Sequence, residues 1–233
     1  MKQQASTDNE QLPLHFETGA RQALPARLRP MVPLRGESPF DDTEWFFEPW
    51  WPGTPALAYV EDFKVRLQIE HLADPMAAFP ELASIGSQFA DDQLIVDGTL
   101  LVLDDEGKPD ADLLRRRLAD PTTRDGTPAY VASDLLYDLA RPLMSRPFGE
   151  RRQQLSALLS DGDRCVVSRG LHGEGTTLAD AITSMGLSEL SARLLSAPYK
   201  PGASDEGWLR VPVVETPAAP TRPLLALLQR LPL

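Results

Sequence analysis

The sequence predicts a mixed α+β domain, because segments with the two-residue alternation of strands are interspersed with segments that have the spacing of amphipathic helices. Of the 233 residues, 42% are hydrophobic and 24% are charged, which is ordinary for a folded chain and excludes disorder throughout. No apolar run approaches the roughly 20 residues that span a bilayer. We therefore expect a substantial core in a chain that does not cross a membrane.

The strand predictions start with residues 56–70, ALAYVEDFKVRLQIE, which alternate apolar and polar side chains around a turn at Glu61 and Asp62. We interpret residues 93–109, QLIVDGTLLVLDDEGKP, as a second strand pair. Helical spacing follows an Asp-Pro start over residues 74–89. Stronger amphipathic patterns predict helices over 110–120, 148–159 and 176–186, and shorter strands are expected within 130–136, 164–170, 193–202 and 207–215.

Composition divides the chain into three parts. Residues 1–24 are polar and aperiodic, so we expect a flexible lead-in, and the Pro-containing approach over 24–40 is interpreted as extended rather than packed. Residues 25–215 form the predicted domain. Residues 216–233 change to PAAPTRP and then LLALLQRLPL, which predicts a Pro-rich tail with a short apolar helix that docks on this domain or on a partner.

Charge and cysteine content exclude several classes of function. The 23 Lys and Arg residues stand against 34 Asp and Glu residues, so the formal net charge is −11, opposite to the surface that phosphate-backbone binding favours. The single Cys165 cannot form an internal disulfide or a thiolate metal cluster. Because the N-terminus has no apolar signal-like stretch, a cytoplasmic location is expected.

The residues alone do not predict a catalytic or metal site. His15, His71 and His172 are far apart and lack metal-ligand spacing, so we expect no metal ion. The most unusual stretch is the aromatic segment 43–53, TEWFFEPWWPG, which is either a binding platform or a buried plug. Large aromatic side chains mostly serve cores, so packing is the favoured interpretation.

The order of several segments resembles the nucleotidyltransferase (adenylation) domain of bacterial ATP-dependent DNA ligases, of the ligase D type. The resemblance covers roughly residues 29–213. It implies an ATP-grasp-like, DNA-ligase adenylation fold of antiparallel sheets packed with helices. The matching segments, in order, are RPM, PFDDTEWFFEPWWPG, TPALAYV, FPELA, VDGTLLVLDDEGKPD, YVASDLLYDL, PFGERRQQLSALL, GEGTTLADAITSMGL, ARLLSAPYKPG and GWLRV.

The first family motif, FEPKWDG, carries the lysine that attacks the α-phosphate of ATP, and this sequence has FEPWWPG. The lysine position is Trp50, whose indole has no usable lone pair for phosphoryl attack. The motif's aspartate falls at Pro52 and its following arginine at Pro55. Glu48 is retained. The lysines of the chain are Lys2, Lys64, Lys108 and Lys200, none of them near this motif in the sequence.

The remaining motifs of the family are degenerate in the same way. Glu70 stands where an arginine is expected to contact substrate, Thr99 replaces the carboxylate of the DGE motif, and Ser133 replaces the adenine-stacking phenylalanine. The later motifs lose a glutamate and alter three lysines. Those positions are Ser188 for the glutamate, and Arg193, Arg210 and Pro212 for the lysines.

This pattern implies a DNA ligase-like protein that is catalytically inactive, a pseudoenzyme that acts as an interaction or regulatory protein linked to DNA repair. We expect no cofactor, weak or no direct DNA binding, and a protein partner such as a true ligase or repair factor. Only about 20 residues follow Val213, so no C-terminal OB-fold is expected in this chain. The alternatives are an active DNA ligase that uses ATP and Mg²⁺ with a non-standard site or a partner's OB-fold, and a non-catalytic nucleotide-binding module.

Overall fold

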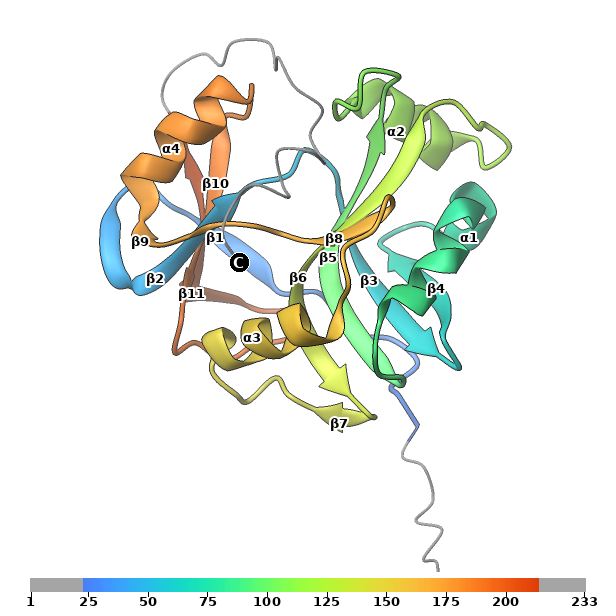
Figure 1. Cartoon of the computed structure of the whole chain (residues 1–233), viewed down its shortest axis with the longest axis horizontal. Helices are drawn as coiled ribbons and strands as arrows, with labels where there is room; N and C mark the ends of the chain where they lie inside the picture. The colour runs from blue at the N-terminus through green and yellow to red at the C-terminus, as the bar shows by residue number, and fades with distance from the viewer. Residues whose placement is uncertain (1–22, 214–233) are drawn as a thin grey trace, which may run out of the picture.

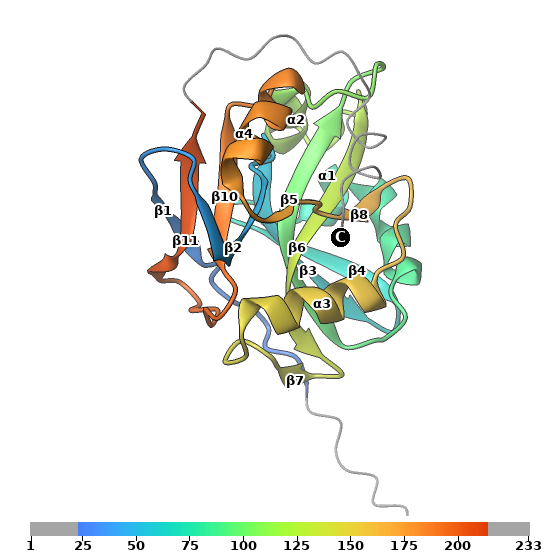
Figure 2. The same cartoon turned by 60° about the vertical axis from the view of Figure 1, so that its left-hand side comes forward.

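Two β-sheets form the framework of the computed structural model, which describes residues 23–213 (Figures 1 and 2). One sheet has five strands in the order β1-β11-β10-β2-β9, and the other has β4-β3-β5-β6-β7 with β8 against β6. Pairing is antiparallel except between β1 and β11 and between β6 and β8. The strands are β1 Val32–Arg35, β2 Asp41–Pro49, β3 Thr54–Glu61, β4 Lys64–Ile69, β5 Leu94–Leu103, β6 Thr127–Asp138, β7 Arg141–Pro142, β8 Cys165–Val167, β9 Leu171–Glu174, β10 Glu189–Leu194 and β11 Ser204–Pro212.

The helices lie against these sheets, so the predicted α+β class is confirmed. Figure 1 shows α4 beside the five-stranded sheet and α1 and α2 beside the six-stranded sheet. The helix predicted over 74–89 is wrong in form, because Pro80 separates a single α-turn from a 3-10 helix. The helices are α1 Pro75–Ala78, the 3-10 helix η1 Pro80–Gln88, α2 Ala111–Ala119, α3 Phe148–Leu158 and α4 Gly175–Ser184.

The predicted strand pair within 93–109 is also wrong, because this segment contains one long strand, β5. It pairs with β3 on one side and β6 on the other. After β5 the chain turns at Asp104, whose Oδ1 accepts hydrogen bonds from the amides of Glu106 and Lys108 at 2.9 and 2.8 Å. The turn leads into α2, where Asp110 caps the helix. The pairing partners of β5 therefore come from distant parts of the sequence.

The approach over residues 24–40 is packed, contrary to the expectation of an extended lead-in. Met31 is buried, and residues 32–35 form β1 at the edge of the five-stranded sheet. The amide of Leu28 donates to the Tyr59 hydroxyl and the amide of Met31 to the Tyr199 hydroxyl, both at 2.8 Å. These partners are far away in sequence, which explains why the local pattern did not predict the packing.

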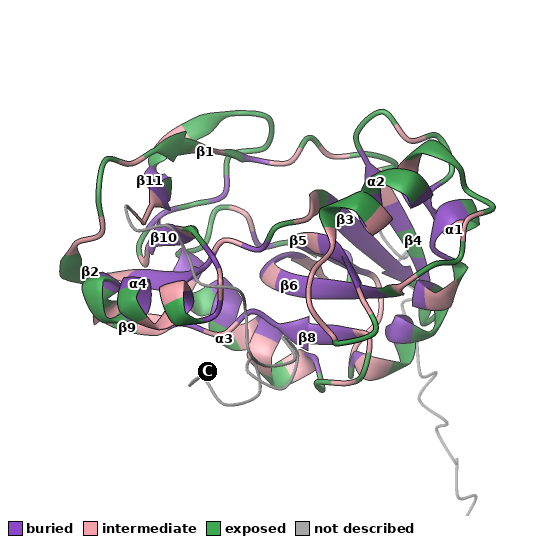
Figure 3. Cartoon of the chain, turned by 90° about the horizontal axis from the view of Figure 1, so that it is seen from above, coloured by how far each residue is buried: buried purple, intermediate pink, exposed green. Residues whose placement is uncertain are grey.

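The buried residues, purple in Figure 3, lie mainly in the strands of both sheets and in parts of the helices, and their apolar side chains form clusters that join strands to helices. Leu82 and Ile85 of η1 pack with β4 and β5 in one cluster, and Leu178 and Ile182 of α4 pack over β2 and β10 in another. Burial on this scale is the main stabilising term of the fold. The sheets are thus held rigidly enough to position a site between them.

Some sequence predictions fall outside the residues that the structure describes. These are the flexible lead-in over 1–24, apart from its last two residues, and the Pro-rich tail with its apolar helix over 216–233. Within residues 23–213, no helix is long and apolar enough to cross a membrane.

The turn between β3 and β4 yields a stability prediction. Asp62 and Phe63 have φ values of 52° and 56°, the left-handed conformation of a type I′ turn, and the Phe63 side chain is 51% exposed. Phe63→Gly should raise the free energy of unfolding by about 1 kcal/mol, since glycine adopts this conformation without a steric cost. Urea denaturation measures the change. Phe63→Ala, which retains a Cβ atom, is the control and should show no such gain.

Candidate functional site

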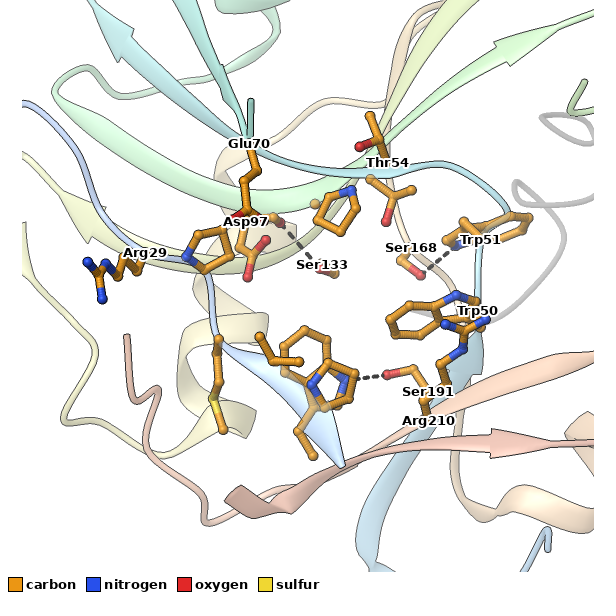
Figure 4. A pocket seen from close by; sticks show the side chains of 18 of the residues that line it. Arg29, Trp50, Trp51, Thr54, Glu70, Asp97, Ser133, Ser168, Ser191 and Arg210 are labelled. Carbon is orange, nitrogen blue, oxygen red and sulfur yellow. Dashed lines mark hydrogen bonds between the residues drawn. The ribbon is translucent and has the colours of Figure 1, made fainter. Parts of the chain in front are cut away.

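A cleft of about 1160 Å³ lies between the two sheets, where the start of β3, the middle of β5 and β6, and the cleft-facing side chains of β10 and β11 meet. The segment 27–33 forms another part of its wall. Figure 4 shows the cleft with Glu70 and Asp97 on one side and Trp50, Ser191 and Arg210 on the other. Its volume slightly exceeds the roughly 300–1,000 Å³ of typical small-molecule sites.

The structure brings most of the sequence-predicted site residues together, although they come from seven separate segments. Eight of them line the cleft: Glu48, Trp50, Pro55, Glu70, Thr99, Ser133, Arg193 and Arg210.

Three of the predicted positions do not line the cleft. Pro52 is exposed at the turn between β2 and β3. Ser188 is exposed and precedes β10, whose cleft-facing side chains include Ser191 and Arg193. Pro212 lies at the far end of β11, paired with Glu189. The family motifs predicted these three positions in the pocket, but Pro52 lies in an exposed turn, and Ser188 and Pro212 lie where β10 begins and β11 ends, outside the lining of the cleft.

Trp50 occupies the wall of the cleft as part of a stack of aromatic and guanidinium groups. The centroids of the Trp50 and Trp208 rings are 6.4 Å apart at an interplanar angle of 40°. The guanidinium of Arg210 lies 4.6 Å from the Trp50 ring centroid, and that of Arg193 lies 4.1 Å from the Trp208 ring centroid. Such cation–π contacts are favourable and fix the orientation of the rings.

The aromatic segment 43–53 supports both interpretations that its sequence left open. Phe46, Phe47 and Trp51 are buried, and the Trp51 indole Nε1 donates to the Ser168 hydroxyl at 3.1 Å. Trp50 is only partly buried and faces the cleft. Most of the segment therefore packs, and one indole faces the cleft.

A buried network of ion pairs forms the floor of the cleft. The Arg151 guanidinium donates to both carboxylate oxygens of Asp134 at 2.8 Å, and Arg193 Nη1 lies 3.2 Å from Asp134 Oδ2. Glu48 lies 3.4 Å from Arg193 and 3.6 Å from Arg152. Burial lowers the pKa of the Arg152 guanidinium, an effect that the Glu48 carboxylate opposes.

Arg151 and Arg152 belong to this network, although the sequence patterns did not predict them as site residues. A signal was present, because both follow Phe148 and precede Leu155 at helical spacing, which places them on the buried face of α3. Two arginines on such a face need buried carboxylate partners. The partners could not be named without the fold, since Glu48 and Asp134 come from other strands.

Asp97 on β5 is a second buried carboxyl group in the cleft. The Tyr199 hydroxyl donates to its Oδ2 at 2.7 Å, and Ser133 Oγ donates to its main-chain oxygen at 3.3 Å. Burial raises the pKa of Asp97 from 3.8 to about 6, although Arg193 and the Tyr199 hydrogen bond act in the opposite direction. Burial also raises the pKa of Tyr199.

The raised pKa of Asp97 predicts a pH-dependent stability. The folded chain retains this proton up to about pH 6, whereas the unfolded chain releases it near 3.8, so the contribution of Asp97 is present below pH 4 and declines until about pH 6. Relative to Asp97→Asn, the free energy of unfolding should fall by about 3 kcal/mol across this window. Denaturant titrations of both proteins at several pH values measure this difference, and parallel profiles would contradict it.

The described part of the cleft has no lysine in its lining and no cluster of three metal-ligating side chains. Within residues 23–213, none of the lysines lines the cleft, and Lys200 instead pairs with Asp205 outside it. In the same part of the chain, no group of three His, Cys, Asp or Glu side chains is arranged to hold a metal ion. The cleft side chains are suited to binding aromatic or charged groups.

Comparison with known proteins shows that the sequence is similar to part of bacterial LigD proteins. The sequence is 27% identical over 184 residues to the multifunctional non-homologous end joining DNA repair protein LigD of Mycobacterium tuberculosis, an alignment that covers 78% of this chain and 24% of that protein. The chain thus spans about a quarter of the length of this curated relative. No protein-family model matches the sequence.

Solved structures show the same similarity. A mycobacterial DNA ligase D complexed with ATP and MES superposes with a TM-score of 0.68 at 26% identity, covering 79% of this chain and 60% of that one. The ligase domain of M. tuberculosis LigD gives a TM-score of 0.67 at 26% identity, covering 78% and 58%. The adenylation-domain fold expected from the sequence is thereby confirmed.

Proposed function

We propose that this chain, which is homologous to the ligase domain of LigD, is a DNA ligase-like domain that has lost nucleotidyl transfer and acts as an interaction or regulatory protein. Homology supports the ligase-like fold and a link to DNA repair. The loss of activity and the regulatory role are inferred from the chemistry of the cleft.

A single observation carries this proposal: Trp50 faces the cleft at the position that holds the nucleophilic lysine in the family's first motif. Its ring lies near Trp208 and Arg210 and offers no amine to attack phosphorus. The lysines Lys64, Lys108 and Lys200 lie elsewhere in the described fold. An adenylylated lysine intermediate is therefore not expected.

The charges in the cleft support the same proposal. Arg193, at a second lysine position of the family, is committed to Asp134 and Glu48 beneath the cleft. Glu70, at an expected arginine position, contributes negative charge at the cleft surface. Carboxylates at this place disfavour a polyphosphate.

The volume of the cleft favours a second candidate, a non-catalytic nucleotide-binding module. A cleft of about 1160 Å³ with two indoles could hold a nucleobase without reacting with it. Saturable binding of ATP in calorimetry without a covalent product would support this second function over the first.

The proposal also includes the DNA affinity of the protein, its partner and its location in the cell. With a net charge of −11, affinity for a nicked duplex should be in the non-specific range of about 10⁻⁴ M or weaker at physiological salt. We propose a protein partner, a true ligase or another repair factor, in the cytoplasm.

A nick-sealing assay tests the proposal. The full chain is incubated with ATP, Mg²⁺ and a nicked duplex, beside the ligase domain of M. tuberculosis LigD as the positive control. We expect no sealed product from this chain at any concentration at which the control seals the nick. Sealing by this chain would support the active alternative, with a non-standard site.

A further inference from the structure

The tail contains a motif that the proposed function does not use. Residues 216–223 read TPAAPTRP, so that Pro217, Pro220 and Pro223 recur at every third position. A polyproline II helix has three residues per turn and rises about 3.1 Å per residue, so this spacing would place all three prolines on one face. The tail lies outside the described residues, and the inference uses only its sequence.

The cleft has the features of a groove that binds the proline face of a polyproline II helix. Proline-rich segments dock in grooves lined by aromatic side chains, which pack against the pyrrolidine rings. Trp50 and Trp208 provide two neighbouring indoles, and Pro49 and Pro55 add further apolar surface. The residue that stands at the lysine position of the family thus contributes one of the two indoles.

The tail begins close to this groove. The amide of Val213 donates to the Ser188 carbonyl at 2.8 Å, and Pro212 pairs with Glu189. The amide of Trp50 in turn donates to the Glu189 carbonyl at 3.0 Å. Two interstrand spacings, about 10 Å, therefore separate the end of β11 from the backbone of Trp50.

The tether is long enough for the tail to fold back. The four residues from Val213 to Pro217 span up to about 14 Å when extended. A short tether of this kind gives an effective concentration of about 1 mM, which suffices for a weak contact within the chain.

One carboxylate of the cleft is available to the basic residue of the tail, in a lining that also contains Arg27 and Arg29. Glu70 lines the cleft and is exposed, and within the described residues its ion-pair partner is His71, at 3.5 Å, rather than a lysine or arginine. Arg222 lies between Pro220 and Pro223 in the tail. The Arg222 guanidinium, which lies next to the proline face, can therefore pair with the Glu70 carboxylate.

We propose that the cleft is a groove for a polyproline II segment, and that residues 217–223 of this same chain occupy it. This inference rests on the proposed function, because a cleft that no longer processes a nucleotide is available to another ligand.

The test uses the full chain and a fluorescently labelled synthetic peptide of residues 214–225, VETPAAPTRPLL. The triple variant Pro217→Ala, Pro220→Ala, Pro223→Ala should bind the peptide saturably in fluorescence polarisation. The unmodified chain should bind it about tenfold more weakly, if the groove binds a free segment with a Kd of about 0.1 mM and the tethered copy competes at about 1 mM. The double variant Ala218→Ser, Thr221→Ser alters tail residues that are not on the proline face. It should therefore bind the peptide as weakly as the unmodified chain does.

Substitutions of cleft residues test whether the peptide binds in the cleft. In the triple-variant background, Trp50→Leu should abolish binding and Glu70→Arg should weaken it at least fivefold, as about 1 kcal/mol of a paired charge predicts. Asp105→Arg, an equal change in charge at an exposed turn outside the cleft, should leave binding unchanged. Because Glu70 is exposed, Glu70→Arg should fold even if Trp50→Leu does not.

Three results would overturn the proposal: no binding to the triple variant, equal binding to the triple variant and the unmodified chain, or binding that Glu70→Arg leaves unchanged. None of these results bears on catalysis. The formation of an AMP adduct, which would contradict the proposed function, is measured without the peptide, so the two failures are distinguishable.

Discussion

Asp134→Ala should lower the free energy of unfolding by about 3–5 kcal/mol, the largest effect of a single substitution that we expect on stability. Asp134 is completely buried, and its carboxylate receives two hydrogen bonds from Arg151 and lies 3.2 Å from Arg193. Its removal leaves two guanidinium groups in the interior with insufficient compensating charge. Equilibrium denaturation of the full chain measures the loss.

The matched control for this prediction is Glu61→Ala. Glu61 and Arg66 form an exposed ion pair at 3.8 Å on neighbouring strands. Such pairs contribute about 1 kcal/mol or less, so this variant should unfold at nearly the unmodified denaturant concentration. Equal losses for the two variants would show that the buried network does not stabilise the floor of the cleft.

Trp50→Lys should leave adenylylation at least about a thousandfold slower than that of the LigD ligase domain, although it restores the amine. Groups that act as a unit are not additive, so repair of one member of a broken set returns little. The new lysine would lie beside the Arg210 guanidinium, in a cleft where no three His, Cys, Asp or Glu side chains of the described residues are arranged to hold a metal ion. Nine other family positions remain changed in this variant: Pro52, Pro55, Glu70, Thr99, Ser133, Ser188, Arg193, Arg210 and Pro212.

The rate of AMP incorporation from labelled ATP, measured for the unmodified chain, Trp50→Lys and the LigD ligase domain under the same conditions, tests this prediction. A rate for Trp50→Lys within about tenfold of the ligase domain would show that the lysine alone had been limiting.

Sequence patterns predicted the fold class and the adenylation-domain resemblance because both depend on local periodicity and on ordered motifs. The hairpin over residues 56–70 exists as β3 and β4, and the helix over 110–120 exists as α2. Errors arose where tertiary pairing overrides local pattern. The single strand β5 and the packed segment around Met31 both depend on partners that are distant in the chain.

The sequence likewise predicted part of the candidate site, and the rest depends on tertiary contacts. Alignment to the family motifs brought Trp50, Thr99 and Arg193 to one cleft because those motifs report a shared fold. The alignment said nothing of the ion pairs beneath, since the partners of Arg151 and Arg152 come from separate elements. The stacking of Trp50 with Trp208 and Arg210 likewise depends on side-chain positions that the sequence does not encode locally.

Intact-mass spectrometry of the full chain after incubation with ATP and Mg²⁺ tests the central claim most directly, because it reports a covalent AMP adduct on any residue, including a nucleophile such as His71 that the family does not use. The LigD ligase domain serves as the positive control in the same buffer. The account predicts a single unmodified mass for this chain, since no amine faces the α-phosphorus from the Trp50 position. A mass increase equal to one AMP, localised by peptide mapping to a residue of the cleft, would contradict it.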